Sequence, residues 1–175
     1  IWNQKSRNWL VPRFIAWKAS IIISNSFATK TMLVKKFYIP GIKIRVLHNG
    51  VNIPLNFDYS YKCKKNSSIF RIGFLGRLDT PKGVHVIINA MRYLVNDNIK
   101  LVIAGNGVLE GLLKEQANDL ENVFFIGRIK KPYSFLSSLD LLIVPSIREP
   151  LGNVCLEAGL CKIPVLAANV DGIPE

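Results

Sequence analysis

Short apolar runs alternate with segments of helical period along most of this chain, and that alternation constrains its fold more than any other feature. After residue 69 the apolar runs are Phe70–Leu75, Lys100–Ala104, Val123–Ile126, Leu141–Val144 and Pro164–Ala167. The segments between them repeat their apolar residues at three and four positions, most clearly from Val84 to Val95. Alternating strands and helices build parallel sheets, and strands that are apolar throughout are covered on both faces. We therefore predict an α/β fold with a Rossmann-like parallel sheet and helices on both faces.

A shorter stretch of the same pattern precedes this one. Strands are predicted at Ser20–Ser24 and Ile42–Leu47, with a helix over about 26–37, whereas residues 53–68 scatter Pro, Asn, Ser and Lys without a period. We expect residues 1–52 to be the end of one Rossmann-like domain, 53–68 an interdomain linker and 69–175 a second domain. Because the chain begins at Ile1 and stops at Glu175 within the pattern, we interpret it as a fragment of a longer protein.

The positive charge is concentrated before the second domain. Residues 1–70 hold 12 Lys and Arg and one acidic residue, which accounts for the whole formal net charge of +11, while residues 71–175 balance to zero. A basic region with Trp2, Trp9 and Trp17 suits docking on an anionic membrane surface, unless residues upstream neutralise the charge. A basic nucleic-acid-binding module is a weaker alternative, because no helix-turn-helix, RNP or zinc pattern is present. We expect no nucleic-acid partner.

The ends, cysteines and histidines indicate an intracellular setting. No apolar run approaches the roughly 20 residues of a membrane span, and basic residues interrupt any signal-peptide core. Cys63, Cys155 and Cys161 form no CxxC pair, and the two histidines are not at ligand spacing to a cysteine. We expect a cytoplasmic protein, peripheral at the inner face of the cell membrane, with no metal site. His48 is interpreted as structural.

Candidate chemistry lies in the loops after the strands, because open parallel sheets bind ligands at the carboxyl ends of their strands. The first loop, Gly76–Gly83, carries Arg77 and Lys82 between glycines and suits a diphosphate, although a solvated loop is the alternative. The Gly105-Asn106-Gly107 turn resembles a dinucleotide fingerprint, but Glu110 occupies the third glycine position, so a tight turn into a helix explains it better.

The loop after Val144 is the most informative. It places Glu149 before a helix expected over about 153–161 and Glu157 within that helix. Two such carboxylates could form an acid/base pair or accept hydrogen bonds from vicinal hydroxyls of a ribose and a sugar. The amides of Gly152, Asn153 and Val154 at the helix start favour a phosphate.

Several segments resemble, in order and spacing, the retaining glycosyltransferase family 4 (group 1), whose members have the GT-B fold of two facing Rossmann-like domains. The segments are GRLDTPKG, GNG, FFIGRI, PSIREPLGNVCLEAGLCKIPVLA and DGIPE, with SIIISNS and VLHNGVN upstream. The resemblance covers the chain from about residue 15 to its end. It implies transfer of a sugar from a nucleotide-diphosphate-sugar donor to a glycan or lipid-linked acceptor, with retention of configuration, in surface-polysaccharide or lipid-linked glycan synthesis.

The resemblance also implies roles for individual residues. Arg77 and Lys82, next to Gly76, would clamp the donor diphosphate and replace a metal ion, so that no metal or other cofactor is needed. Glu149 would contact the donor sugar and Glu157 the ribose. Leu151, Gly152, Asn153 and Val154 would approach the sugar and phosphates, and Ile129 the nucleobase. Acceptor-side residues are expected upstream of Ile1, so we expect the fragment alone to be inactive in turnover. A nucleotide-sugar epimerase of the same fold is the alternative.

Three positions depart from the family pattern. Lys162 stands where the family usually has Gly at a helix end, Asp171 replaces the first glycine of the usual GGxPE loop, and Leu151 replaces the more frequent Phe. If the backbone at Lys162 is left-handed, lysine costs up to about 1 kcal/mol there.

Overall fold

The computed structural model describes residues 10–52, 68–94 and 98–175. Residues 10–52 are called the N-terminal part below, and the described residues from 68 onward the C-terminal part. The predicted linker over 53–68 lies outside the described residues except for Ser68, so the domain boundaries stay a prediction. None of the helices in the described ranges combines the length and the apolar character that a membrane crossing needs.

The N-terminal part is a two-stranded parallel sheet with helices beside it. Its elements are α1 (Leu10–Lys18), β1 (Ile22–Ser24), α2 (Phe27–Phe37) and β2 (Ile44–Val46), with a short 3-10 helix at Gly41–Lys43. The hydroxyl of Ser26 caps α2 by accepting a hydrogen bond from the Thr29 amide at 2.9 Å. Ala16, Ile39 and Ile44 are buried together in a small core.

The C-terminal part alternates strands and helices as predicted. Its elements are β3 (Phe70–Leu75), α3 (Val84–Met91), β4 (Ile99–Ala104), α4 (Glu110–Gln116), β5 (Val123–Gly127), α5 (Pro132–Ser137), β6 (Leu141–Val144), α6 (Asn153–Leu160) and β7 (Val165–Ala167), with a 3-10 helix at Thr80–Lys82 before α3. The five strands form one parallel sheet in the order β5-β4-β3-β6-β7.

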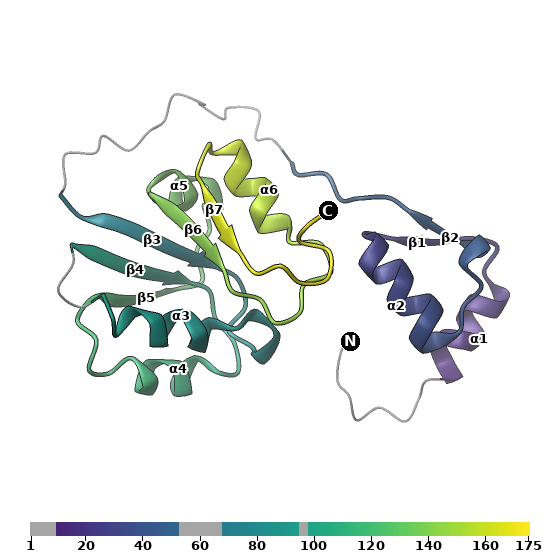
Figure 1. Cartoon of the computed structure of the whole chain (residues 1–175), viewed down its shortest axis with the longest axis horizontal. Helices are drawn as coiled ribbons and strands as arrows, with labels where there is room; N and C mark the ends of the chain where they lie inside the picture. The colour runs from purple at the N-terminus through teal and green to yellow at the C-terminus, as the bar shows by residue number, and fades with distance from the viewer. Residues whose placement is uncertain (1–9, 53–67, 95–97) are drawn as a thin grey trace.

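Helices cover both faces of this sheet, which confirms the predicted fold class. One buried cluster joins β3 and β4 to α3 and α4, and a second joins β6 to α5 and α6. Figure 1 shows α3 and α4 along one side of the sheet and α5 and α6 along the other. The apolar stripe that begins at Val84 explains this packing, because Val84, Ile87, Ile88 and Met91 are all buried.

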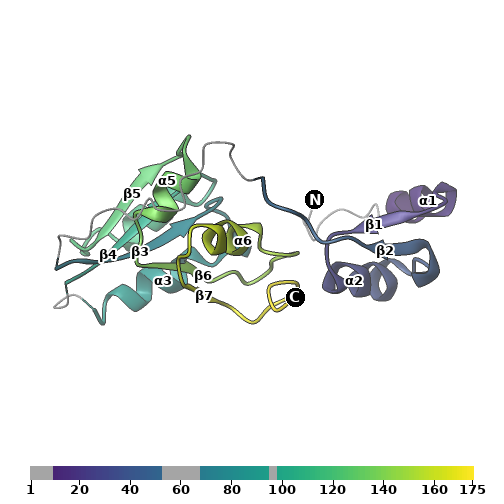
Figure 2. The same ribbon diagram turned by 90° about the horizontal axis from the view of Figure 1, so that it is seen from above.

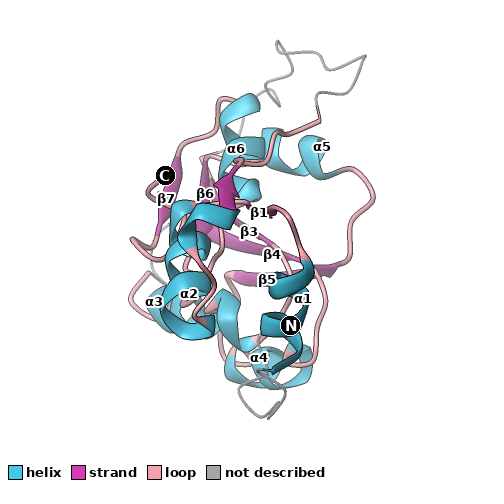
Figure 3. Ribbon diagram, turned by 90° about the vertical axis from the view of Figure 1, so that its right-hand side faces the viewer, coloured by secondary structure: helices cyan, strands magenta, loops and turns pink. Residues whose placement is uncertain are grey.

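The strand order creates a place for a ligand. The chain leaves β3 toward β4 and leaves β6 toward β7, so β3 and β6 are neighbours whose following loops diverge to opposite faces. Ligands of open α/β sheets bind in the crevice at such a switch point. The N-terminal part lies on this side of the sheet (Figures 1 and 2), and Figure 3 looks from it toward the strand ends.

Several predicted boundaries and one omission differ from the structure; the strand predicted at Ser20–Ser24, for example, begins at Ile22. The predicted helix from Val84 to Val95 ends at Met91, because Arg92, Tyr93 and Leu94 donate to carbonyls three residues back and tighten the last turn. The strand predicted at Ile42–Leu47 is shortened by the 3-10 helix before it. The helix α1 has no counterpart among the predicted elements.

Candidate functional site

A pocket of about 380 Å³ opens at the switch point, between the two parts of the chain. Its lining residues are Asn25, Asn49, Leu75, Gly76, Arg77, Lys82, Glu149, Pro150, Leu151, Gly152, Asn153, Val154 and Glu157. Every candidate site residue predicted from the sequence, except Ile129, is among them. Ile129 follows β5 at the edge of the sheet and is half-buried there.

Two loops bind each other to form one wall of the pocket. The carbonyl of Pro81 accepts hydrogen bonds from the amides of Ile147 (2.8 Å) and Arg148 (3.2 Å). Gly83 has a φ of +65°, and a Cβ there would lie 2.1 Å from the Pro145 carbonyl oxygen. Only glycine permits so close an approach, and the approach carries Lys82 toward the loop that contains Glu149.

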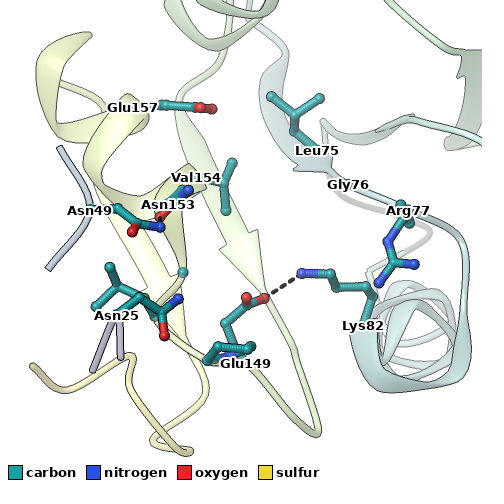
Figure 4. Close-up of a pocket in the computed structure, with 13 residues that line it drawn as sticks. Asn25, Asn49, Leu75, Gly76, Arg77, Lys82, Glu149, Asn153, Val154 and Glu157 are labelled. Atoms are coloured by element: carbon teal, nitrogen blue, oxygen red, sulfur yellow. Dashed lines mark hydrogen bonds and ion pairs between the residues drawn. The ribbon is translucent and has the colours of Figure 1, made fainter. Parts of the chain in front are cut away.

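Lys82 and Glu149 form an ion pair inside this pocket (Figure 4). The Lys82 Nζ lies 2.5 Å from the Glu149 Oε2, with side-chain exposures of 22% and 10%. The buried hydroxyl of Ser146 donates to the same Oε2 at 3.2 Å. Glu149 is the only buried charged residue in the described part of the chain, and a lysine and a hydroxyl compensate its burial.

Arg77 lies beside Lys82 but is held differently. Its side chain is 75% exposed, and its Nη2 pairs with the Asp79 Oδ2 at 3.0 Å. Figure 4 shows the guanidinium and the Lys82 ammonium on the same side of the pocket. Two cations on one wall would attract a polyanion such as a diphosphate, and an exposed arginine can turn toward it.

The N-terminus of α6 forms the opposite wall. Gly152 has a φ of +86° and precedes the helix, which has no side-chain cap hydrogen bond at this end. The amides of Asn153 and Val154 therefore lie at an uncapped helix start that borders the pocket. Such an end favours anionic groups.

Glu157 reaches the pocket from the second turn of α6 (Figure 4). Asn153 and Glu157 lie four residues apart on α6, and both line the pocket. Burial raises the pKa of the Glu157 carboxyl. A desolvated carboxylate is a strong hydrogen-bond acceptor for paired hydroxyl groups.

The Gly105-Asn106-Gly107 segment supports the site from behind. Gly105 has a φ of +143°, and a Cβ there would lie 1.8 Å from the Gly76 carbonyl oxygen. The Leu78 amide donates to the Asn106 carbonyl at 2.9 Å. This agrees with the interpretation as a tight turn, which here supports the loop that carries Arg77.

Four lining residues were not predicted from the sequence: Leu75 and Pro150, which adjoin predicted residues, and Asn25 and Asn49 of the N-terminal part. Asn25 follows β1 and Asn49 follows β2, and the Asn49 Nδ2 donates to the Asn153 Oδ1 at 3.1 Å. Both lie at the carboxyl ends of parallel strands, so the rule that ligands bind at these ends would have predicted them too.

Lys162 and Asp171, which stand where the family usually has glycine, both adopt a left-handed backbone conformation. Lys162 has a φ of +56° and Asp171 a φ of +44°. The Asp171 Oδ2 accepts a hydrogen bond from the Glu149 amide at 3.0 Å, so this replacement adds a contact that glycine lacks. Lys162 is exposed and ends α6 in the left-handed conformation.

Within residues 10–52, 68–94 and 98–175, no group of three His, Cys, Asp or Glu side chains is arranged to hold a metal ion.

The chain is similar to known glycosyltransferases. The family described as Glycosyl transferases group 1 matches residues 60–175. An uncharacterized glycosyltransferase of Methanocaldococcus jannaschii is 33% identical over 88% of this chain and 43% of its own length. The capsular polysaccharide biosynthesis glycosyltransferase CapM of Staphylococcus aureus is 27% identical over 94% of this chain and 47% of its own.

A solved structure has a similar fold. The crystal structure of Anabaena Alr3699/HepE in complex with UDP and glucose superposes with a TM-score of 0.80 and 26% identity, over 94% of this chain and 49% of that one. The chain thus spans about half the length of the relatives it matches. The family match, the two relatives and the shared fold show that the chain belongs to the group 1 glycosyltransferases.

Proposed function

We propose that the chain is the donor-binding half of a glycosyltransferase that transfers a sugar from a nucleotide-diphosphate sugar to an acceptor. The observation that carries this proposal is the make-up of one pocket: two cations, an uncapped helix N-terminus and two carboxylates face the same space. This set matches the parts of such a donor, which has an anionic diphosphate and two groups of vicinal hydroxyls. The family membership and the UDP-bound neighbour support the same conclusion.

The charged residues of the pocket have distinct roles in this proposal. Lys82 and Arg77 stabilise the negative charge that appears on the diphosphate as its bond to the sugar breaks, and the α6 amides share that charge. Glu149 accepts hydrogen bonds from sugar hydroxyls, and Glu157 from the ribose. Because the two cations supply the charge that a metal ion would otherwise supply, we propose that donor binding needs no metal. The nucleobase contact of Ile129 belongs to the same proposal.

The finer reaction follows the family resemblance. We propose assignment to family 4, transfer with retention of configuration, and a glycan or lipid-linked acceptor in surface-polysaccharide synthesis, which the similarity to CapM supports. The relatives described above are glycosyltransferases, so the comparisons do not favour the epimerase alternative.

Isothermal titration with UDP and UDP-glucose tests the proposal. We expect saturable binding in EDTA that is unchanged by Mg²⁺, and a loss of roughly tenfold or more in Lys82→Met, because each 1.4 kcal/mol of lost interaction is tenfold. Lys114→Met is the matched control, since Lys114 is exposed on α4 and pairs with Glu110. Glu149→Ala should also weaken binding of UDP-glucose. Wild-type affinity in both Lys82→Met and Glu149→Ala would refute the site, and the absence of binding would refute the function.

Docking on an anionic membrane surface stays a prediction, together with the cytoplasmic location. The helix α1 supports the prediction of membrane docking, because Phe14, Ile15 and Trp17 are exposed there and the Lys18 Nζ lies 4.7 Å from the centre of the Trp17 ring. Co-sedimentation with vesicles that contain anionic lipid, compared with neutral vesicles, tests it. Equal recovery with both would contradict the prediction.

A further inference from the structure

One carboxylate near the end of the sequence joins the two parts of the chain. The Glu175 Oε1 accepts a hydrogen bond from the Ala28 amide at 2.8 Å, and its Oε2 accepts one from the Phe27 amide at 2.7 Å. The His48 Nε2 lies 2.8 Å from the same Oε2. In Figure 1 the C-terminal end lies between α6 and α2. The carboxylate thus contacts both the N-terminus of α2 and His48 in the segment after β2.

This contact bears directly on the pocket. Asn25 lies two residues before Phe27, and Asn49 follows His48, so each pocket asparagine is adjacent to a group that Glu175 holds. The Thr29 hydroxyl also donates to the Asn25 Oδ1 at 3.1 Å, which ties Asn25 to the first turn of α2. Fixing this turn and His48 therefore fixes both asparagines.

The loop that carries Glu175 is anchored to the other wall of the pocket. Its Gly172 amide donates to the Glu149 carbonyl at 3.1 Å, beside the contact between Asp171 and the Glu149 amide. A Cβ on Gly172 would lie 1.9 Å from the Pro150 carbonyl oxygen and 3.0 Å from the Ser26 Cβ. The loop is thus packed between the Glu149 segment and the start of α2, with no room for a side chain at Gly172.

We propose that Glu175 is a positioning residue that clamps the N-terminal part onto the C-terminal part and so holds Asn25 and Asn49 at the side of the donor pocket that the N-terminal part contributes. The clamp stands on these contacts alone, whereas its effect on a nucleotide-sugar ligand rests on the proposed function. A carboxylate suits the place because it meets two helix N-terminal amides and an imidazole. Burial raises the pKa of Glu175, but the hydrogen bonds from His48, Phe27 and Ala28 outweigh this and lower it overall. The group is therefore the anion that the clamp needs.

Hydrogen exchange and ligand affinity, measured on the whole chain, test the clamp. In Glu175→Ala we expect the Phe27 and Ala28 amides to exchange about tenfold faster or more, because they lose their acceptor. The amides of Leu101 and Ile103 in β4 should keep their rates and so report an intact core. The affinity for UDP-glucose should fall by roughly tenfold. Glu115→Ala, an exposed carboxylate on α4, should change neither quantity.

Variants of His48 separate positioning from general stability. His48→Gln can still donate to the carboxylate and should keep most of the affinity, whereas His48→Ala should lose part of it. If Glu175→Ala also speeds amide exchange in β4, the substitution has loosened the core, and Glu175→Gln is then measured in its place. Glutamine keeps the shape of the side chain and one acceptor oxygen.

Two results would overturn the clamp. One is an unchanged exchange rate of the Phe27 and Ala28 amides in the Glu175 variant. The other is an unchanged affinity for UDP-glucose in that variant, provided that the wild-type chain binds UDP-glucose. If the wild-type chain binds no UDP-glucose, the proposed function fails, and the exchange rates alone decide whether the clamp exists.

Discussion

The ion pair between Lys82 and Glu149 makes a prediction about stability that needs no ligand. Replacing Glu149 by alanine removes the partner of a lysine whose side chain is only 22% exposed. It also removes the acceptor of the Ser146 hydroxyl, which is 1% exposed. Glu149→Gln keeps an acceptor for Ser146 and for Lys82 but removes the charge. The two variants therefore separate the charge from the hydrogen bonds.

The expected size follows from these contacts. A hydrogen bond to a charged group contributes about 1.5–3 kcal/mol, and Lys82 recovers part of that loss from water because it is partly exposed. The stranded Ser146 hydroxyl adds about 1 kcal/mol. We expect Glu149→Ala to lower the free energy of unfolding by about 2–4 kcal/mol and Glu149→Gln by about 1–2 kcal/mol. At about 2–4 °C per kcal/mol for a chain of this size, alanine should lower Tm by roughly 4–16 °C.

Thermal unfolding followed by circular dichroism at neutral pH measures these differences. Glu115→Ala and Glu115→Gln, on the exposed surface of α4, are the matched controls and should stay within about 0.5 kcal/mol of wild type. The order wild type, Gln, Ala is the expected result. If both Glu149 variants unfold at the wild-type temperature, the pair does not compensate the burial of Glu149 and the reasoning is wrong.

Three further predictions concern the backbone and the second carboxylate. Lys162→Gly should raise the free energy of unfolding by up to about 1 kcal/mol, because φ is +56° there; denaturant titration measures it, and a loss of stability would contradict it. Gly105→Ala should destabilise the chain by several kcal/mol (about 3 or more), since its Cβ would meet the Gly76 carbonyl; a Tm near wild type would refute the close approach. Because burial raises the pKa of Glu157, its protonated form is favoured in the fold, and the associated stability is present at low pH and lost as pH rises through that raised pKa. Glu157→Gln should therefore be more stable than wild type at neutral pH, with a difference that disappears below about pH 4, and a difference independent of pH would contradict this.

Local patterns were sufficient to predict most of the C-terminal part. Strands β3 and β6 have the predicted bounds, because an apolar run flanked by polar residues specifies a buried strand without help from distant residues. The end of α3 was not predictable in this way. Leu94 continues the apolar stripe and still packs against the core, but it does so from a tight turn and not from the helix.

The site residues also divide into those that local patterns predict and those that they do not. Arg77, Lys82, Glu149 and Glu157 were found because each follows a strand in its own unit, and the switch point brings their loops together. The contribution of the N-terminal part was not found. The contact of Asn49 with Asn153 spans 104 residues of sequence, and that of Phe27 with Glu175 spans 148. No periodicity records which loops of two separate sheets will meet.

The most direct test of the proposed donor site is a titration of the ¹⁵N-labelled chain with UDP, followed by the amide resonances in two-dimensional NMR spectra. The account predicts saturable shifts for the amides of Gly76, Gly152, Asn153 and Val154, which border the pocket, and none for Leu112 on the exposed face of α4. The same shifts should be lost in Lys82→Met. Shifts confined to residues away from the pocket, or no shifts at any UDP concentration, would contradict the claim that this pocket binds the diphosphate of a nucleotide sugar.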